Sequence, residues 1–349
     1  MLRFMESFDH CGPIIATTTE IAQRLATKWD VIDQHIDETY YGDKKSFWLE
    51  VGYKSQGYCL CFSNSQSNFL VKLLDNQDTW SVGFAFKTPA AGTVTPELVC
   101  ALYSKETPVV SITYTDSISG GRLFVKKTTG TTIISMSTYL TESTWYYVEF
   151  KTYVHPTAGT CEFRIDGSVI GTASSVAFTG LTDADKLIVT NVGNCCFDDI
   201  YVLDGQTGLD DFLGPSKVSV VYPISDGGPN DWSPVGDHYT LVDDPTLTMS
   251  DNVYTNANGS EIFNFDDAPG SGSLYGVQLV AQLAVAGSQI NTAKLICQSG
   301  VNEASVEQSI MQQDNHTDII MPVDIDPNTG AAWTRSNLNA AKFGVERVG

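Results

Sequence analysis

Five aspartates stand close together in the sequence and could bind a cation: Asp198, Asp199, Asp204, Asp210 and Asp211. Clusters of carboxylate oxygens bind hard cations such as Ca²⁺, so Asp198, Asp199 and Asp204 form a candidate calcium site at the exit of one strand. Their spacing matches no EF-hand loop. The alternative, which we favour, is that Asp199 caps backbone donors while the others stay solvated. We therefore expect no required cofactor, with calcium as the single candidate.

The eight cysteines and five histidines lack the spacing of a metal site. A Cys-x2-Cys pair is missing and the histidines stand far apart, so zinc binding is not predicted. Cys59 and Cys61 are two residues apart in a strand-like run, which places both side chains on the same side. The N-terminus has no conventional secretory signal, so free buried thiols are expected. Disulfides remain an alternative under oxidising conditions.

Catalytic carboxylates are not paired in the sequence. A glycosidase needs two carboxylates that face one cleft, and the laminarinase-like enzymes carry them on a Glu-x-Asp-x-x-Glu strand. No glutamate here has an aspartate two residues later, and Glu149 and Glu162 stand alone in their strands. A Gly-x-Ser-x-Gly elbow, a phosphate loop and a dinucleotide fingerprint are also missing. We predict that the protein is not an enzyme.

Aromatic residues offer a second kind of site. Rings that stay exposed on a sandwich can stack against the apolar face of a sugar. The candidates are Tyr40, Tyr41, Trp48, Tyr103, Tyr114, Trp232 and Tyr239. The alternative is that most of these rings complete hydrophobic cores, and one sequence does not decide between the two.

The elements that would position these residues are strands. The acidic residues comprise 28 Asp and 13 Glu, and with 29 Gly they favour turns between short strands. Strand-like runs recur every ten to fifteen residues from Phe47 to Leu203, as in a double-sheet jelly roll. Large and small residues alternate over Trp80–Phe86, and Asp166-Gly167 predicts a hairpin turn. One early helix is expected over residues 18–29, with Ile21, Leu25 and Trp29 on its apolar side.

A change in composition suggests two domains. Residues 206–216 combine Gly, Pro and like charges, so we place a linker there, between a jelly roll with its N-terminal lead-in at 1–205 and a smaller β-sandwich at 217–349. Strands in the second domain are expected at 217–222, 238–242, 261–265, 275–285, 293–297 and 318–321. A late helix is expected over Trp333–Phe343.

The charge excludes several kinds of partner. Twenty basic residues face 41 acidic ones, a net charge of −21. Binding nucleic acid needs clustered cations, and anionic lipid would be repelled. A run of 18 apolar residues is missing, so no membrane span is predicted. Residues 206–349 carry 18 acidic and 5 basic side chains, a net −13.

Two groups of motifs resemble known families. A Trp-led strand, a short hairpin and a closing Asp-Asp strand, at Trp145–Phe150, Glu162–Gly167 and Phe197–Asp204, resemble the laminin-G and concanavalin A-like jelly roll. Four further segments are similar to tailed-bacteriophage virion proteins that pair such a jelly roll with a second β domain: Glu6–His10, Leu74–Phe86, Asp211–Gly214 and Asp326–Thr334 with Phe343–Val345. This resemblance implies a component of the particle and supplies no catalytic residues.

The expected protein is thus all-β and non-enzymatic, a structural component of a tailed-phage virion. It would be assembled in the host cytoplasm and would be external, collar, tail-associated or capsid-decorating. The expected partners are other virion proteins and further copies of the chain, with Trp333, Leu338 and Phe343 as candidate assembly contacts. These three residues would alternatively close their own domain's core. The other functions considered are a glycan-binding adhesin for the host surface and, disfavoured, a polysaccharide-degrading enzyme.

Overall fold

The computed structural model describes residues 1–12, 17–33, 47–63, 68–90, 97–117, 120–206, 211–243, 251–285, 291–310 and 317–349. These form two compact units. Unit 1 is Met1 with Arg3–Val218, and unit 2 is Leu2 with Ser219–Gly349. The division falls two residues beyond the linker expected at 206–216. Tyr40 and Tyr41 lie outside the described residues.

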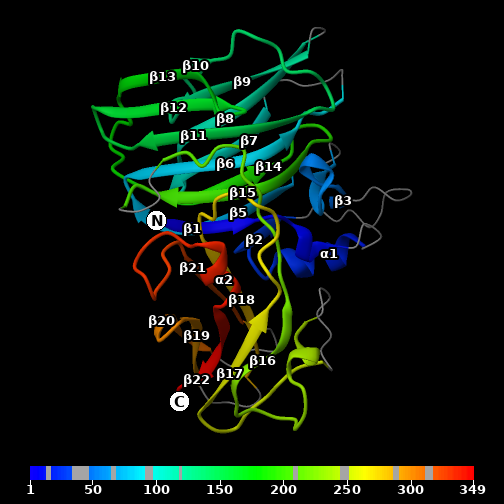
Figure 1. Ribbon diagram of the computed structural model, residues 1–349. Helices are drawn as coiled ribbons and strands as arrows, with labels where there is room; N and C mark the ends of the chain where they lie inside the picture. Colours follow the sequence, from blue (N-terminus) through cyan, green and yellow to red (C-terminus); the bar gives the residue numbers. More distant parts are fainter. Residues whose placement is uncertain are drawn as a thin grey trace. The chain divides into compact units, whose positions relative to one another are not determined.

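Unit 1 is a sandwich of two sheets whose aligned strand pairs are antiparallel (Figure 1). The eight-stranded sheet has the order β13-β12-β11-β6-β15-β4-β3, with β1 beside β15. Its strands are β1 (Leu2–Glu6), β3 (Phe47–Val51), β4 (Tyr58–Phe62), β6 (Thr79–Lys87), β11 (Trp145–Tyr153), β12 (Gly159–Ile165), β13 (Ser168–Val176) and β15 (Cys196–Asp204). The jelly-roll expectation for this half agrees with the two-sheet architecture.

The second sheet of unit 1 has seven strands in the order β10-β9-β8-β7-β14-β5-β2. They are β2 (Val31–Asp33), β5 (Phe69–Gln77), β7 (Glu97–Ser104), β8 (Thr107–Ser117), β9 (Gly120–Lys127), β10 (Thr132–Ser135) and β14 (Ala184–Thr190). The indole Nε1 of Trp80 on β6 donates to the carbonyl of Ala184 on β14 at 3.0 Å and so joins the two sheets.

Strand β6 shows why the alternating sequence builds this sandwich. Trp80, Phe84 and Phe86 point between the sheets and are at most 1% exposed. Successive side chains of a strand point to opposite faces, so the small residues between them lie on the outer face. The predicted hairpin is also present, because Asp166 and Gly167 join β12 to β13 with φ of 49° and 76°.

The predicted early helix is α1 (Thr18–Leu25), which ends four residues before Trp29. Thr17 caps it, and the Glu20 carboxylate accepts from the Thr17 N–H at 2.6 Å in a capping box. Ile21, Leu25 and Trp29 are buried as the four-residue spacing requires.

Unit 2 contains a five-stranded sheet, β16-β17-β22-β19-β20, and the pair β18-β21. The strands are β16 (Pro223–Asn230), β17 (Gly259–Phe265), β18 (Val277–Leu283), β19 (Asn291–Ser299), β20 (Asn302–Ile310), β21 (Thr317–Val323) and β22 (Lys342–Arg347). Helix α2 spans Arg335–Asn339, shorter than expected. The core includes Leu295, Cys297, Ile319, Trp333 and Phe343. None of the helices in the described ranges is long and apolar enough to cross a membrane.

Two expected strands of unit 2 are wrong. Residues 217–222 form no strand, and 238–242 contain a short 3-10 turn at Tyr239–Leu241. Two strands that were not expected form the edges of the sheet: β16 pairs with β17 at one edge, and β20 pairs with β19 at the other. Edge strands need only one paired side and tolerate Pro, Gly and charge, so Pro223–Asn230 and the polar Asn302–Ile310 lack the apolar alternation that identifies a strand.

Candidate functional site

The outer face of the eight-stranded sheet carries cysteine, tyrosine, tryptophan and charged side chains. Strand register places Trp48, Cys61, Cys196, Lys87 and Trp145 in one row across five neighbouring strands. Because side chains alternate along a strand, residues two positions away continue the same face. The face therefore carries further rows toward the opposite end of the strands.

The central row contains Tyr201, Gly83, Glu149 and Arg164. The Tyr201 hydroxyl donates to Glu149 Oε1 at 2.6 Å. Gly83 lies between these two side chains in register, and a Cβ at this position would collide with the Tyr201 ring. The glycine thus lets tyrosine and carboxylate meet across the middle strand.

Residues 211–218, which we name the strap, cover this central row. Their backbone N–H groups donate to side chains of the sheet: Leu213 to the Tyr201 hydroxyl at 3.2 Å, Gly214 to Glu149 Oε1 at 2.8 Å and Val218 to Asp199 Oδ1 at 2.8 Å. Part of the expected linker is therefore bonded to the jelly roll. The Val218 N–H supplies a hydrogen bond to buried Asp199, and the Gly214 N–H is a second donor to Glu149 Oε1 beside the Tyr201 hydroxyl.

Burial under the strap changes the acidity of these carboxyls. It raises the pKa of Glu149 and the pKa of Asp199, and Glu149 Oε2 and Asp199 Oδ2 are buried without a hydrogen bond. Burial and the neighbouring Asp199 raise the pKa of Asp198. The neutral acids are favoured because burial penalises a carboxylate more than a carboxylic acid.

The candidate calcium residues are not brought together. Asp198 accepts from the Tyr53 and Asp199 backbone N–H groups, at 2.7 and 2.8 Å. Asp204, at the other end of β15, pairs with the N-terminal ammonium at 2.9 Å and with Arg3 Nε at 2.5 Å. Asp199 bonds a backbone N–H, as the capping alternative expected, but Asp198 and Asp204 are 2% and 0% exposed, so the expectation that they stay solvated is wrong.

A groove of about 470 Å³ opens on the same face beyond the central row. Its charged side chains are ordered in pairs. Arg164 Nε donates to Glu162 Oε1 at 2.7 Å, and Lys151 Nζ lies 3.8 Å from Asp211 Oδ1. The strap forms one side, where the Arg164 guanidinium lies 4.0 Å from the centre of the Phe212 ring.

Neutral hydrogen-bonding groups complete the groove. Tyr153 lies on its floor, and its ring stacks on the His155 imidazole with centroids 5.8 Å apart. Four hydroxyl groups on three strands also line the groove, from Thr79 on β6, Thr160 on β12, and Thr172 and Ser174 on β13. Glu162 was considered as a lone strand acid, whereas Tyr153, Lys151 and Arg164 were not singled out by sequence reasoning. The signal that could have found them is alternation: Lys151 and Tyr153 on β11, and Glu162 and Arg164 on β12, are each two residues apart and so share a face.

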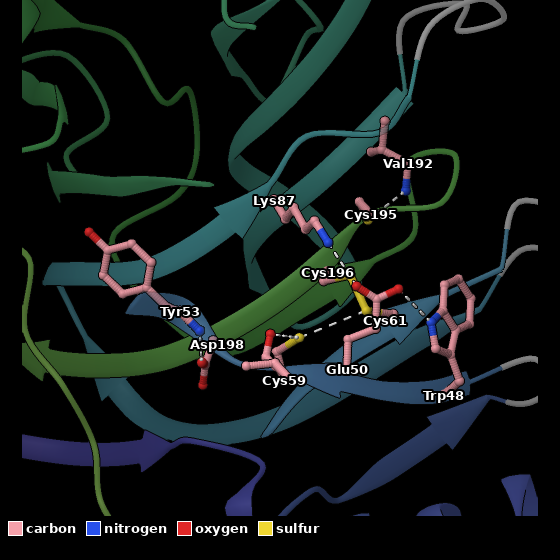
Figure 2. The surroundings of a disulfide bond; sticks show 11 residues. Trp48, Glu50, Tyr53, Cys59, Cys61, Lys87, Val192, Cys195, Cys196 and Asp198 are labelled. Carbon is pink, nitrogen blue, oxygen red and sulfur yellow. Dashed lines mark hydrogen bonds and ion pairs between the residues drawn. A yellow bond between two sulfur atoms is a disulfide. The ribbon is translucent and has the colours of Figure 1, made fainter. Parts of the chain in front are cut away.

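Three sulfur atoms, from Cys59, Cys61 and Cys196, meet on the outer face of the sheet (Figure 2). Cys61 and Cys196, 135 residues apart in sequence, form a disulfide between β4 and β15. Cys59 Sγ lies 3.8 Å from Cys61 Sγ, as expected for two cysteines on one side of a strand. The disulfide corrects the expectation of free thiols at these two positions. Six other cysteines are free and buried: Cys11, Cys59, Cys100, Cys161, Cys195 and Cys297.

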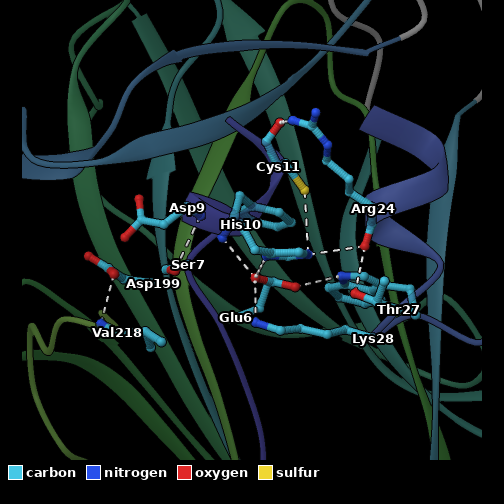
Figure 3. Close-up of polar contacts among 12 residues, drawn as sticks. Glu6, Ser7, Asp9, His10, Cys11, Arg24, Thr27, Lys28, Asp199 and Val218 are labelled. Atoms are coloured by element: carbon cyan, nitrogen blue, oxygen red, sulfur yellow. Dashed lines mark hydrogen bonds and ion pairs between the residues drawn. The ribbon is translucent and has the colours of Figure 1, made fainter. Parts of the chain in front are cut away.

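A thiol, an imidazole and a carboxylate lie in series near the N-terminus (Figure 3). Cys11 Sγ is 3.5 Å from His10 Nε2, and His10 Nδ1 is 3.3 Å from Glu6 Oε1. His10 Nε2 also lies 3.1 Å from the Arg24 carbonyl. Both ring nitrogens therefore face oxygen acceptors, which suits a donor rather than a general base. Burial raises the pKa of Cys11, so the arrangement does not suit nucleophilic catalysis.

The same cluster holds the N-terminal segment in place. Burial alone would raise the pKa of Glu6, but Lys28 and His10 keep that pKa well below its ordinary value. Lys28 Nζ lies 3.2 Å from Glu6 Oε1, and the Trp29 indole N–H lies 3.3 Å from Glu6 Oε2. A buried carboxylate paired in this way is structural, because removing a partner would leave an uncompensated charge.

The candidate assembly residues lie in or against the core of unit 2. Trp333 and Phe343 are 4% and 7% exposed, and Leu338 packs against the same core. The Trp333 indole donates to the Val323 carbonyl at 3.0 Å. This placement favours the alternative that they close their own domain. Among the aromatic candidates, Tyr114 is fully buried, whereas Trp48, Tyr103, Trp232 and Tyr239 are half-buried.

No protein-family model matches the chain, and no curated protein matches it. Solved structures share its sandwich architecture only distantly. They include a pentraxin from Limulus polyphemus, at 12% identity over 40% of this chain and 71% of that one, with a TM-score of 0.32. A glucuronan lyase from Trichoderma reesei is 12% identical over 54% of this chain and 95% of that one, with a TM-score of 0.37. Domain 4 of an arabinanase from Geobacillus stearothermophilus, in complex with arabinotriose, is 14% identical over 58% of this chain and 92% of that one, with a TM-score of 0.37. At these values the likeness carries no functional argument.

Proposed function

We propose that the chain is a non-enzymatic glycan-binding protein and that the sugar occupies the groove on the outer face of unit 1. The observation that carries the proposal is the ordered Arg164–Glu162 pair beside Tyr153, ringed by four hydroxyl side chains. Sugars present many hydroxyls that both donate and accept, together with apolar ring faces. Fixed charged groups and an aromatic ring supply matching partners, and the volume is that of a small-ligand site.

The charges of the groove favour a neutral glycan. Two cations, Lys151 and Arg164, lie beside two carboxylates, Glu162 and Asp211. A net charge of −21 on the whole chain repels polyanions at a distance. A neutral oligosaccharide has no such cost.

The absence of hydrolysis is part of the same proposal. Glycoside cleavage needs a free acid and a free base or nucleophile at a cleft. Glu162 is engaged by Arg164, and Glu149 is fully buried beneath the strap. These contacts support binding without turnover.

The phage setting rests on the sequence resemblance alone. None of the neighbours named above is described as a virion protein. In a virion, glycan binding would serve attachment to the host surface, and the expected homo-oligomer would raise avidity through several weak sites.

The test is a glycan array followed by calorimetry on the full-length protein. We expect binding of a neutral oligosaccharide that weakens at least tenfold in Arg164→Ala and in Tyr153→Ala. Matched controls are Arg122→Ala and Tyr139→Ala, because Arg122 also stacks on aromatic rings but lies on β9 of the other sheet. Binding that is unchanged in both groove variants, or no glycan bound at all, would reject the proposal. If the wild-type protein released sugar and Glu162→Gln abolished that release, the protein would be an enzyme and the proposal of binding without cleavage would be wrong.

A further inference from the structure

The sulfurs of Cys59, Cys61 and Cys196 form a group with metal-ligand geometry. The Sγ atoms of Cys59, Cys61 and Cys196 all lie within 4.8 Å of one another. Within the described part of the chain, this is the single set of three or more histidine, cysteine or acidic ligand atoms that close together. Strand pairing fixes two of them, since Cys61 and Cys196 are directly opposite each other with Cα atoms 4.0 Å apart.

The separation of the sulfurs fits a bound cation. A cation bonded to sulfur at ~2.3 Å holds its ligands ~3.8 Å apart in a tetrahedron and ~4.0 Å apart in a trigonal plane. The Sγ atoms of Cys59 and Cys61 are 3.8 Å apart. Releasing the Cys61–Cys196 bond would let that pair separate to a similar distance while both Cα positions stay fixed by the sheet.

We propose that reduction of the Cys61–Cys196 disulfide converts this group into a three-thiolate site for a soft cation, Cu⁺ in the first place. The reductant is an external dithiol. It supplies two electrons and two protons, the Cys61–Cys196 bond breaks to give two thiols, and the dithiol closes into its own disulfide. Binding Cu⁺ then releases the three thiol protons, and the sulfurs become the ligands.

The surroundings favour Cu⁺ over Zn²⁺. Soft thiolates select both ions, but protein-bound Zn²⁺ is almost always four-coordinate. The described residues bring no fourth histidine, cysteine or acidic ligand atom into the group. Half-buried Trp48 and Trp145 pack against the sulfurs and limit the access of water as a fourth ligand.

The disulfide form is expected to exclude the metal. Two of the three sulfurs are then bonded to each other, so the group offers one thiol in place of three ligands. Lys87 and Glu50, paired at 2.7 Å and 27% and 39% exposed, lie beside the cluster (Figure 2). The site therefore changes with redox state.

The test compares oxidised and reduced full-length protein. One sample is treated with dithiothreitol and desalted without oxygen; both samples are titrated with Cu⁺ against a chromophoric Cu⁺ chelator, and a parallel titration uses Zn²⁺. We expect one Cu⁺ per reduced chain, no comparable binding by the oxidised chain, and weaker binding of Zn²⁺. Stronger Zn²⁺ than Cu⁺ binding would contradict the three-coordinate assignment.

Two variants make the test specific. Cys59→Ser leaves the disulfide possible but removes one ligand, and should weaken Cu⁺ binding by the reduced chain at least tenfold. Cys195→Ser is the control, because Cys195 is buried beside Cys196 in sequence but its sulfur accepts from the Val192 N–H at 3.3 Å (Figure 2). Equal affinity in Cys59→Ser and wild type, or equal affinity with and without reduction, would overturn the proposal.

Near-ultraviolet circular dichroism covers the case in which reduction loosens the fold. If the reduced wild type loses its tertiary signal, Cu⁺ should restore it there and not in Cys59→Ser. Failure to restore the wild-type signal in that case counts against the proposal.

Discussion

The Tyr201 hydroxyl and the Glu149 carboxylate meet at 2.6 Å across Gly83, and the backbone N–H of Gly214 reaches the same carboxylate oxygen. One buried oxygen thus joins two strands of the sheet to the chain segment that leaves it. The contact combines residues 52 positions apart with the strap.

Tyr201→Phe should destabilise unit 1. The change removes one donor and leaves the buried Glu149 oxygen with Gly214 alone, so a loss of about 1–3 kcal/mol in the free energy of unfolding is expected. Chemical denaturation followed by fluorescence measures it. Tyr139→Phe, at an exposed ring, is the control and should change stability little. Equal stability of the two variants would show that the Tyr201 hydroxyl is dispensable.

Asp199→Asn should flatten the dependence of stability on pH. Burial raises the pKa of Asp199, so above pH ~4 the folded state holds a proton that the unfolded state has released. Folding stability therefore falls as pH rises from ~4 to the raised folded pKa, by about 1.4 kcal/mol for each unit of pKa shift. Asparagine keeps an oxygen to accept from the Val218 N–H and cannot ionise.

Thermal unfolding from pH 4 to 9 measures this effect. The Asn variant should gain stability over wild type as pH increases. Asp78→Asn is the control, because Asp78 connects β5 to β6 and is not one of the buried carboxyls that contact the strap. It should leave the pH dependence of stability as in wild type. A wild-type midpoint that rises over this interval because of Asp199 would contradict the raised pKa.

Trp333→Ala should destabilise unit 2. A buried tryptophan removed from a core leaves a cavity, and about 3–5 kcal/mol is expected; the indole bond to Val323 is lost as well. Leu338→Ala, at a half-buried position, should cost less. Light scattering decides the alternative role, since an assembly contact would change the oligomeric state of Leu338→Ala while its thermal midpoint stays near that of wild type.

Truncation should distinguish a passive linker from the strap. A fragment 1–205 lacks every strap contact, whereas 1–218 retains the bonds to Tyr201, Glu149 and Asp199. We expect the longer fragment to have the higher thermal midpoint and to resist proteolysis better. Equal midpoints would show that residues 211–218 contribute nothing to unit 1.

The sequence predicted the elements whose evidence is local. Alternation over Trp80–Phe86, the Asp166-Gly167 turn and the spacing of Ile21 and Leu25 each report on neighbours along one strand or helix, and each appears in the structure. Edge strands such as β20 were not predicted from the sequence, because a strand with one free side needs no apolar alternation.

The site depended on pairings that local patterns do not contain. Cys61 and Cys196 are 135 residues apart, and only strand register shows that they are opposite each other. The linker illustrates the same point. Gly, Pro and Asp predicted a segment with few contacts, but two buried carboxylates and a tyrosine on the sheet accept its backbone N–H groups.

The strap also determines how unit 1 would bear mechanical load. A pull on the chain beyond residue 218 meets the Val218–Asp199 bond first, then the Gly214–Glu149 bond, and then the Leu213–Tyr201 bond. These hydrogen bonds bear the load one after another, so each breaks separately. Tension would thus break the bonds between the strap and these side chains before it pulled along the backbone at the end of β15, Asp204.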